Sequence, residues 1–94
     1  MSKNKSSNEV REKILFFMWQ KRYFNKKHTP ITNLCNKLSE IPCKSINKEV
    51  KRLHAENIIG YKKTHHGLDV YLKPSMKKEI QLIIQKRLEE YYSF

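Results

Sequence analysis

Glycine and cysteine are both scarce in this chain, and their scarcity excludes several kinds of site. The two glycines among 94 residues leave no glycine-rich loop of the kind that cradles nucleotide phosphates. The two cysteines, Cys35 and Cys43, are too few for a disulfide framework and lack a CxxC spacing. We therefore predict a reducing, intracellular compartment, with Cys35 packed in the core. Cys43 is interpreted as a small packing residue at a helix edge, with a redox switch as the alternative.

Long apolar segments are absent as well. The longest apolar run, from Ile14 to Trp19, is far shorter than the roughly 20 residues that a membrane-spanning helix needs. The start of the chain, MSKNKSSNEV, is positively charged but lacks the apolar stretch and cleavage site of a signal peptide. We expect a cytoplasmic protein without a membrane segment.

Acidic residues are few compared with basic ones. Nine Asp and Glu stand against 20 Lys and Arg, which gives a formal net charge of +11. This excess favours a polyanionic partner, nucleic acid first and an anionic membrane surface second. Glu49, Glu56 and Asp69 are interpreted as isolated acids rather than a pair poised for acid–base chemistry. We therefore predict a protein that is not an enzyme and needs no cofactor.

The length fits a single domain. Residues 1–7 are polar and are predicted to form a disordered arm, followed by a main domain over 8–74 and a C-terminal helix over 75–94 that packs on it. A first helix is expected from Ser7 or Asn8 to about Phe24, and a second from Asn33 to about Leu38 with Thr32 as its cap.

The segment from Pro42 to Asn57 has the clearest helical pattern, with Pro42 at its first position. At 3.6 residues per turn, Ile46, Val50 and Leu53 form one narrow apolar stripe. The opposite side carries lysines around a small residue that allows close approach, namely Lys44, Lys48, Lys51 and Ala55. One side of this helix is therefore suited to burial and the other to contact with an anion.

After Asn57 the pattern changes to that of strands. Residues 58–65 and 68–73 are two extended runs around His66-Gly67, which is typical of a β-hairpin. Pro74 ends the second run, and a last helix is expected to reach Tyr92 with a broad apolar side. The fold class is thus α+β.

Two segments resemble the winged helix-turn-helix of compact bacterial and archaeal transcription regulators of the MarR, ArsR and PadR type, ITNLCNKLSEIPCKSINKEVKRLHAENII and GYKKTHHGLDVYLKP. In that pattern Cys35 takes the small-residue position of the second helix, while Ile46 and Leu53 take buried positions of the third. Asn57 replaces the glycine that commonly closes the third helix, and asparagine tolerates the left-handed conformation needed there.

The resemblance implies a protein that binds double-stranded DNA through its third helix in the major groove and its wing on the backbone or minor groove. Lysine and asparagine can contact base edges, whereas Lys51 and Arg52 are expected to hold phosphate. For Ser45 and Asn47 the alternative is local capping or solvent. His65 and His66 are adjacent and have no further ligands near them in sequence, so a metal site in the wing is the less favoured alternative to DNA contact. The DNA-facing residues are predicted to be Lys44, Ser45, Asn47, Lys48, Lys51, Arg52, Lys62, Lys63, His65 and His66.

Aromatic residues form a second stripe on the first helix, outside its core-facing side. In the resembling family, flanking helices commonly form a twofold dimer, so we predict a homodimer. The alternative is that the last helix covers the first within one chain. The predicted dimer interface consists of Phe16, Trp19, Tyr23, Ile80, Ile83, Ile84, Leu88 and Tyr91.

The sequence thus predicts a homodimeric, sequence-specific regulator of transcription with no identifiable small-molecule ligand. Two alternatives remain at this level. A winged helix can bind structured RNA, or it can serve as a protein-interaction module in which the basic face is incidental.

Overall fold

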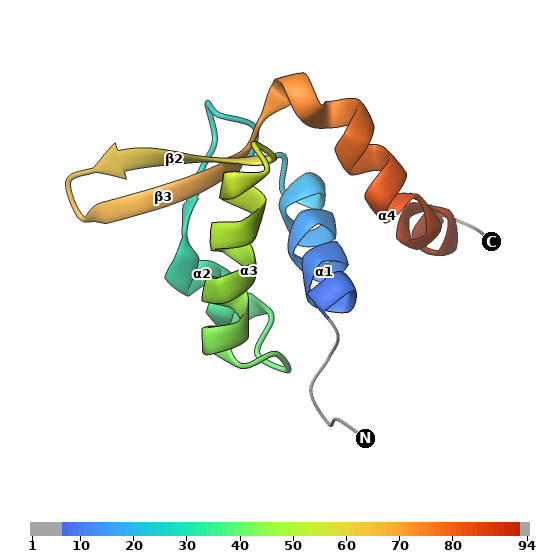
Figure 1. Cartoon of the computed structure of the whole chain (residues 1–94), viewed down its shortest axis with the longest axis horizontal. Coiled ribbons are helices and arrows are strands. Elements are labelled where there is room, and N and C mark those ends of the chain that lie inside the picture. Colours follow the sequence, from blue (N-terminus) through green and yellow to red (C-terminus); the bar gives the residue numbers. More distant parts are fainter. Residues whose placement is uncertain (1–6, 93–94) are drawn as a thin grey trace.

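A computed structural model describes residues 7–92 and has four α-helices and a small antiparallel sheet (Figure 1). The predicted α+β winged helix-turn-helix with an additional C-terminal helix is confirmed. The elements in chain order are α1 (Ser7–Gln20), β1 (Thr29–Pro30), α2 (Ile31–Lys37), α3 (Cys43–Ala55), β2 (Ile59–Thr64), β3 (Gly67–Leu72), the 3₁₀ turn η1 (Pro74–Met76) and α4 (Lys77–Tyr92).

The ends of the helices differ from the prediction where local backbone bonds decide them. Helix α1 stops at Gln20 rather than Phe24, because Arg22 takes a left-handed φ of 61° and its N–H bonds back to the Trp19 carbonyl. Thr32 lies inside α2 and does not cap it, since Pro30 holds the N-cap position. Pro42 likewise caps α3 instead of occupying its first turn.

The predicted role of Asn57 in closing α3 is confirmed. Its φ is 67°, and the flanking amides of Asn57 and Ile58 bond to the carbonyls of His54 and Leu53. This is the pattern of a helix end closed by a left-handed residue, and it turns the chain sharply from α3 into β2.

The sheet has the strand order β1-β3-β2, with both pairs antiparallel. β2 and β3 form the wing, which extends away from the helices on the left of Figure 1. His65 and His66 make the connection, and Gly67 begins β3 with a φ of 133°. The turn is therefore one residue earlier than the predicted His66-Gly67.

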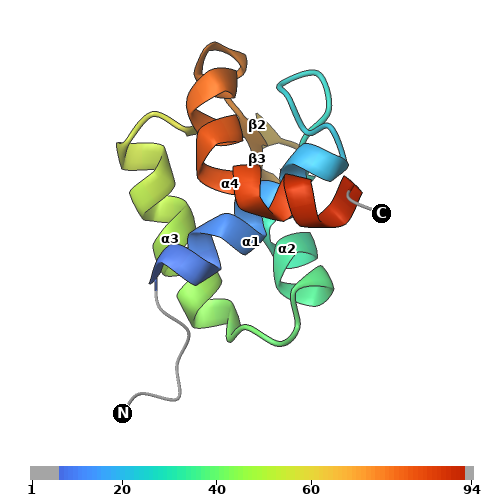
Figure 2. The same cartoon turned by 90° about the vertical axis from the view of Figure 1, so that its right-hand side faces the viewer.

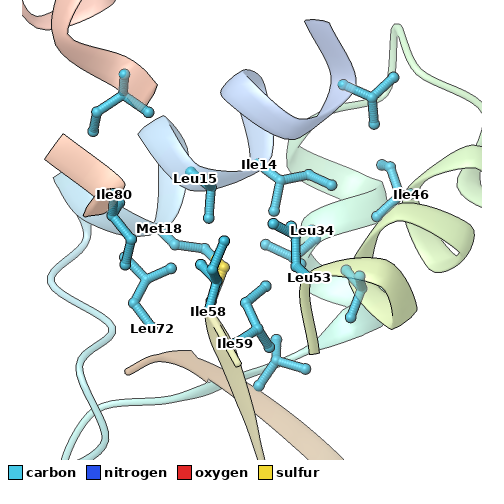
Figure 3. Packing of buried hydrophobic residues seen from close by; sticks show 14 of the residues in the cluster. Ile14, Leu15, Met18, Leu34, Ile46, Leu53, Ile58, Ile59, Leu72 and Ile80 are labelled. Carbon is cyan, nitrogen blue, oxygen red and sulfur yellow. The ribbon is translucent and has the colours of Figure 1, made fainter. Parts of the chain in front are cut away.

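The core lies between α1, α3, α4 and the inner face of the sheet (Figure 3). The predicted stripe of α3 is confirmed, because Ile46, Val50 and Leu53 are completely buried. Leu15 of α1 is also completely buried. Each such side chain contributes roughly 1.5–3 kcal/mol by leaving water.

Helix α4 packs across α1 of the same chain, as Figure 2 shows. Ile80 and Ile84 are completely buried there, so their predicted exposure to a dimer partner is wrong. Arg87 Nε lies 3.1 Å from Glu12 Oε1, and the rings of Phe16 and Tyr91 meet edge to face at 5.7 Å between centroids. These contacts match the alternative in which the last helix covers the first.

The remaining predicted interface residues divide by exposure. Phe16, Trp19, Tyr23, Ile83 and Leu88 are half-buried and pack against the core of their own chain. Tyr91 of the same set is exposed.

Arg11 joins α1 to α3 through two carboxylates. Its Nε donates to Glu49 Oε2 at 2.7 Å, and its terminal nitrogens donate to both oxygens of Glu56 at 2.8 and 2.7 Å. The hydrogen bond from Arg11 lowers the pKa of Glu56, and the same bond raises the pKa of Arg11. The interpretation of Glu49 and Glu56 as isolated acids is therefore wrong, because their cation lies 38 and 45 residues away in sequence.

Asp69 is not isolated either. Its Oδ2 lies 2.7 Å from Nδ1 of His28, and the carboxylate is buried in β3 beside the loop that leads into β1. This contact ties the loop to the base of the wing.

A disulfide joins Cys35 in α2 to Cys43, the first residue of α3. The interpretation of both cysteines as separate packing residues is therefore wrong, and neither thiol is free. Disulfides persist mainly in oxidising compartments, so the argument from few cysteines to a reducing compartment loses its basis. The cytoplasmic location stays a prediction. Within residues 7–92 no helix has the length and apolarity to cross a bilayer.

We predict that Arg11→Ala lowers the free energy of unfolding by about 3 kcal/mol, since it leaves a buried carboxylate without its cation. Glu49 is the group concerned, with a side chain only 4% exposed. Urea denaturation measures the change.

Glu56→Gln is the matched control, because it removes the half-exposed partner and should cost less than about 1 kcal/mol at neutral pH. The lowered pKa of Glu56 adds stability that is present above its ordinary value of 4.5 and is lost as pH falls through its folded value. Equal losses in Arg11→Ala and Glu56→Gln would contradict this account.

We predict that the double variant Cys35→Ser/Cys43→Ser folds but loses about 2–3 kcal/mol of stability, because the disulfide closes a short loop. Reductant should shift the unfolding midpoint of the wild type to that of the variant and leave the variant unchanged. Two titratable thiols in unreduced, denatured wild type would show that the bond does not form.

Candidate nucleic-acid interface

The candidate interface is built on the side of α3 that faces away from the core. Lys44, Lys48 and Lys51 are all exposed there. Within residues 7–92 none of these three lysines forms an ion pair with a carboxylate. The face therefore carries uncompensated positive charge, and no other part of residues 7–92 covers these side chains.

Two constraints on the buried side fix the direction in which these lysines point. The apolar stripe of α3 sets its rotation against α1, and the bond from Arg11 to Glu49 holds the same side from a second element. The disulfide between Cys35 and Cys43 fixes the start of α3 against α2. The disulfide acts at the first residue of α3 and the other two constraints act further along it, so the helix has little freedom to rotate.

Asn47 and Ser45 are placed differently from the lysines. Asn47 Nδ2 donates to the Cys43 carbonyl at 3.0 Å, one turn earlier in the same helix, although the residue is exposed. Ser45 is half-buried. For Asn47 the geometry matches the local-capping alternative, and a contact with adenine would require this bond to open.

Arg52 lies further along α3 and is exposed. Its Nε is 3.9 Å from Glu49 Oε1, a long contact that leaves the guanidinium accessible. The structure thus places Arg52 beside the lysine face, with part of its charge balanced by a buried acid.

The wing supplies a second row of basic residues. Lys62, Lys63, His65 and His66 are exposed on β2 and its turn. Thr64 Oγ1 donates to the Gly67 carbonyl at 3.0 Å, which closes the hairpin end. Within the described part of the chain no group of three potential ligands could hold a metal ion.

A stacked pair that the sequence did not reveal couples the wing to α3. The rings of His54 and Tyr61 lie 3.8 Å apart at an interplanar angle of 15°, and His54 Nδ1 is 3.0 Å from the Ile59 carbonyl. These contacts join the end of α3 to β2, so the two basic elements keep a fixed relation. The only signal in the sequence is an aromatic residue on each element.

No protein-family model and no curated protein matches this sequence. Among solved structures, the chain superposes on a MarR family protein from Bacillus stearothermophilus with a TM-score of 0.57 and 16% identity. The match covers 99% of this chain and 63% of that protein, so this chain spans somewhat less than two thirds of its length. At this identity the likeness concerns the fold. The resemblance to a MarR-type winged helix is thus confirmed at the level of fold.

Proposed function

We propose that this protein binds double-stranded DNA in a sequence-specific manner and regulates transcription as a homodimer. The observation that carries the proposal is the exposed, unpaired lysine face of α3, which lies opposite a completely buried apolar edge. A helix held in this way can enter the major groove without moving its support. The likeness in fold to a MarR family protein supports the same reading.

The lysine face suits the chemistry of a duplex. Lys44 and Lys48, near the start of α3, can reach guanine O6 and N7, while Lys51 and Arg52 are suited to phosphate. The wing cations would approach the adjacent backbone or minor groove. Ser45 and Asn47 remain candidates for base contacts, and Asn47 would first have to leave the Cys43 carbonyl.

A dimer would use the outer face of α4 rather than its buried side. Leu82 is 67% exposed and lies in a shallow groove that runs along this helix, with Lys78 near one end and Glu89 near the other. Two copies of α4 in antiparallel contact would bring Lys78 towards Glu89 of the partner subunit, so the face is self-complementary. The two α3 helices would then read successive major grooves roughly 34 Å apart.

We predict that Lys48→Ala weakens specific duplex binding by about 1–3 kcal/mol, because it removes a base-edge contact. Gel-shift titration on a duplex selected from a random pool measures the change, with structured RNA as competitor. Lys86→Ala, an exposed lysine of α4, is the matched control and should bind as the wild type does. Unchanged binding by Lys48→Ala, or displacement of the duplex by RNA, would contradict the proposal.

We predict that sedimentation equilibrium finds two chains per particle at micromolar concentration. Leu82→Lys should yield monomers, because it replaces the exposed leucine of the groove with a charge. Leu68→Lys, at the other exposed leucine, is the control and should remain dimeric. A monomeric wild type, or a dimeric Leu82→Lys variant, would remove α4 as the interface.

A further inference from the structure

A second set of cations gathers around the loop that joins α1 to β1. The backbone places them together, because the Leu72 N–H donates to the Tyr23 carbonyl at 2.7 Å and brings the end of β3 beside the loop. All but one are exposed, and Lys73 is half-buried. We call this set the loop patch, and its members are Lys21, Arg22, Lys26, Lys27, Lys73 and Lys77.

Aromatic rings beneath the loop patch hold three of its ammonium groups. Lys21 Nζ lies 5.9 Å from the centroid of the Phe17 ring, Lys27 Nζ lies 5.8 Å from that of Tyr23, and Lys77 Nζ lies 5.3 Å from that of Phe24. Such contacts favour one position of an otherwise mobile side chain. The charges of the loop patch are therefore partly ordered before any ligand binds.

The backbone of the loop is also fixed by its conformation. Arg22 and Asn25 both have positive φ, 61° and 69°, and the Lys26 N–H bonds to the Phe24 carbonyl at 2.8 Å. Two left-handed residues within four positions turn the chain tightly and bring the cations on either side of Asn25 to one surface.

The loop patch lacks compensating acids. Within residues 7–92 no carboxylate forms an ion pair with any of its six members. Other cations of the chain are paired, as Arg11 is with Glu49, Lys13 with Glu40 and Arg87 with Glu12. The like charges of the loop patch therefore repel one another until an external anion approaches.

The chemistry of the surface favours the phosphate backbone of a duplex. Tyr23 and Phe24 are half-buried under the cations, so they offer no open ring on which unpaired bases could stack. The exposed large apolar residues of the described chain are Leu68, Leu82, Tyr91 and Tyr92, and none belongs to the loop or to the patch. Tyr91 and Tyr92 border Lys21 at one edge of the loop patch, so binding to a membrane surface is kept as an outcome of the test below.

We propose that the loop patch binds the backbone of a second DNA segment while α3 holds the first, so that the protein bridges two duplexes. In Figure 2 α3 lies on the left of the molecule, and the loop, drawn in cyan, lies at the upper right. A straight duplex docked on α3 would therefore leave the loop patch uncovered. The inference rests on the proposed function for its first DNA segment.

In the test, beads carry the selected duplex with the protein bound to it. The amount of a second, labelled duplex without that site that the beads capture is then measured. The patch variant Lys26→Gln/Lys27→Gln/Lys77→Gln should capture at least about tenfold less, and its slope of log capture against log salt should fall by about 3 because three phosphate contacts are lost. Its affinity for one short duplex and its unfolding midpoint should equal those of the wild type.

The matched control, Lys44→Gln/Lys48→Gln/Lys51→Gln, changes the same number of lysines on α3. If this control no longer binds the short duplex, the proposed function is supported. If it still binds the short duplex, the proposed function is contradicted, whatever the bridging assay shows. If the patch variant still bridges two duplexes, the second duplex is bound by the second α3 of a dimer, and the inference is overturned. Absence of bridging by the wild type would also overturn the inference. The same holds if the only defect of the patch variant is weaker binding to phosphatidylserine vesicles.

Discussion

The burial of one edge of α3 is the interaction on which the rest of the structure depends. Ile46, Val50 and Leu53 leave water completely, and that burial leaves the lysines of the same helix on the outside. The other constraints act on this arrangement. Arg11 holds Glu49 from α1, the disulfide holds Cys43 from α2, and stacking on Tyr61 ties the end of the helix to the wing.

The balance of charge follows from the same arrangement. Most acids that take part in ion pairs do so on the inner side of α3, along α1 or at the base of the wing, where they join elements of the fold. The lysines of the outer side of α3, the wing and the loop patch are left without acidic partners within residues 7–92. The unpaired positive charge of these three regions therefore lies on surfaces that the core does not use.

Local pattern was sufficient to predict α3, the wing and the left-handed Asn57, because each depends on residues close together in sequence. It was insufficient for contacts between distant residues. Nothing in the sequence around Arg11 or Glu49 indicates that they pair. Cys35 and Cys43 face each other only once the turn between α2 and α3 forms. The predicted partner-facing role of Ile80 failed because a broad apolar side on a helix does not say which surface covers it.

The place where a duplex touches the protein is the most direct test of the role of α3. Nuclear magnetic resonance of lysine side chains labelled with ¹⁵N, titrated with one short duplex of the selected site, reports this contact residue by residue. The account predicts that the ammonium signals of Lys44, Lys48 and Lys51 shift first, together with those of the wing. Shifts confined to the lysines of α4, with those of α3 unchanged, would contradict it.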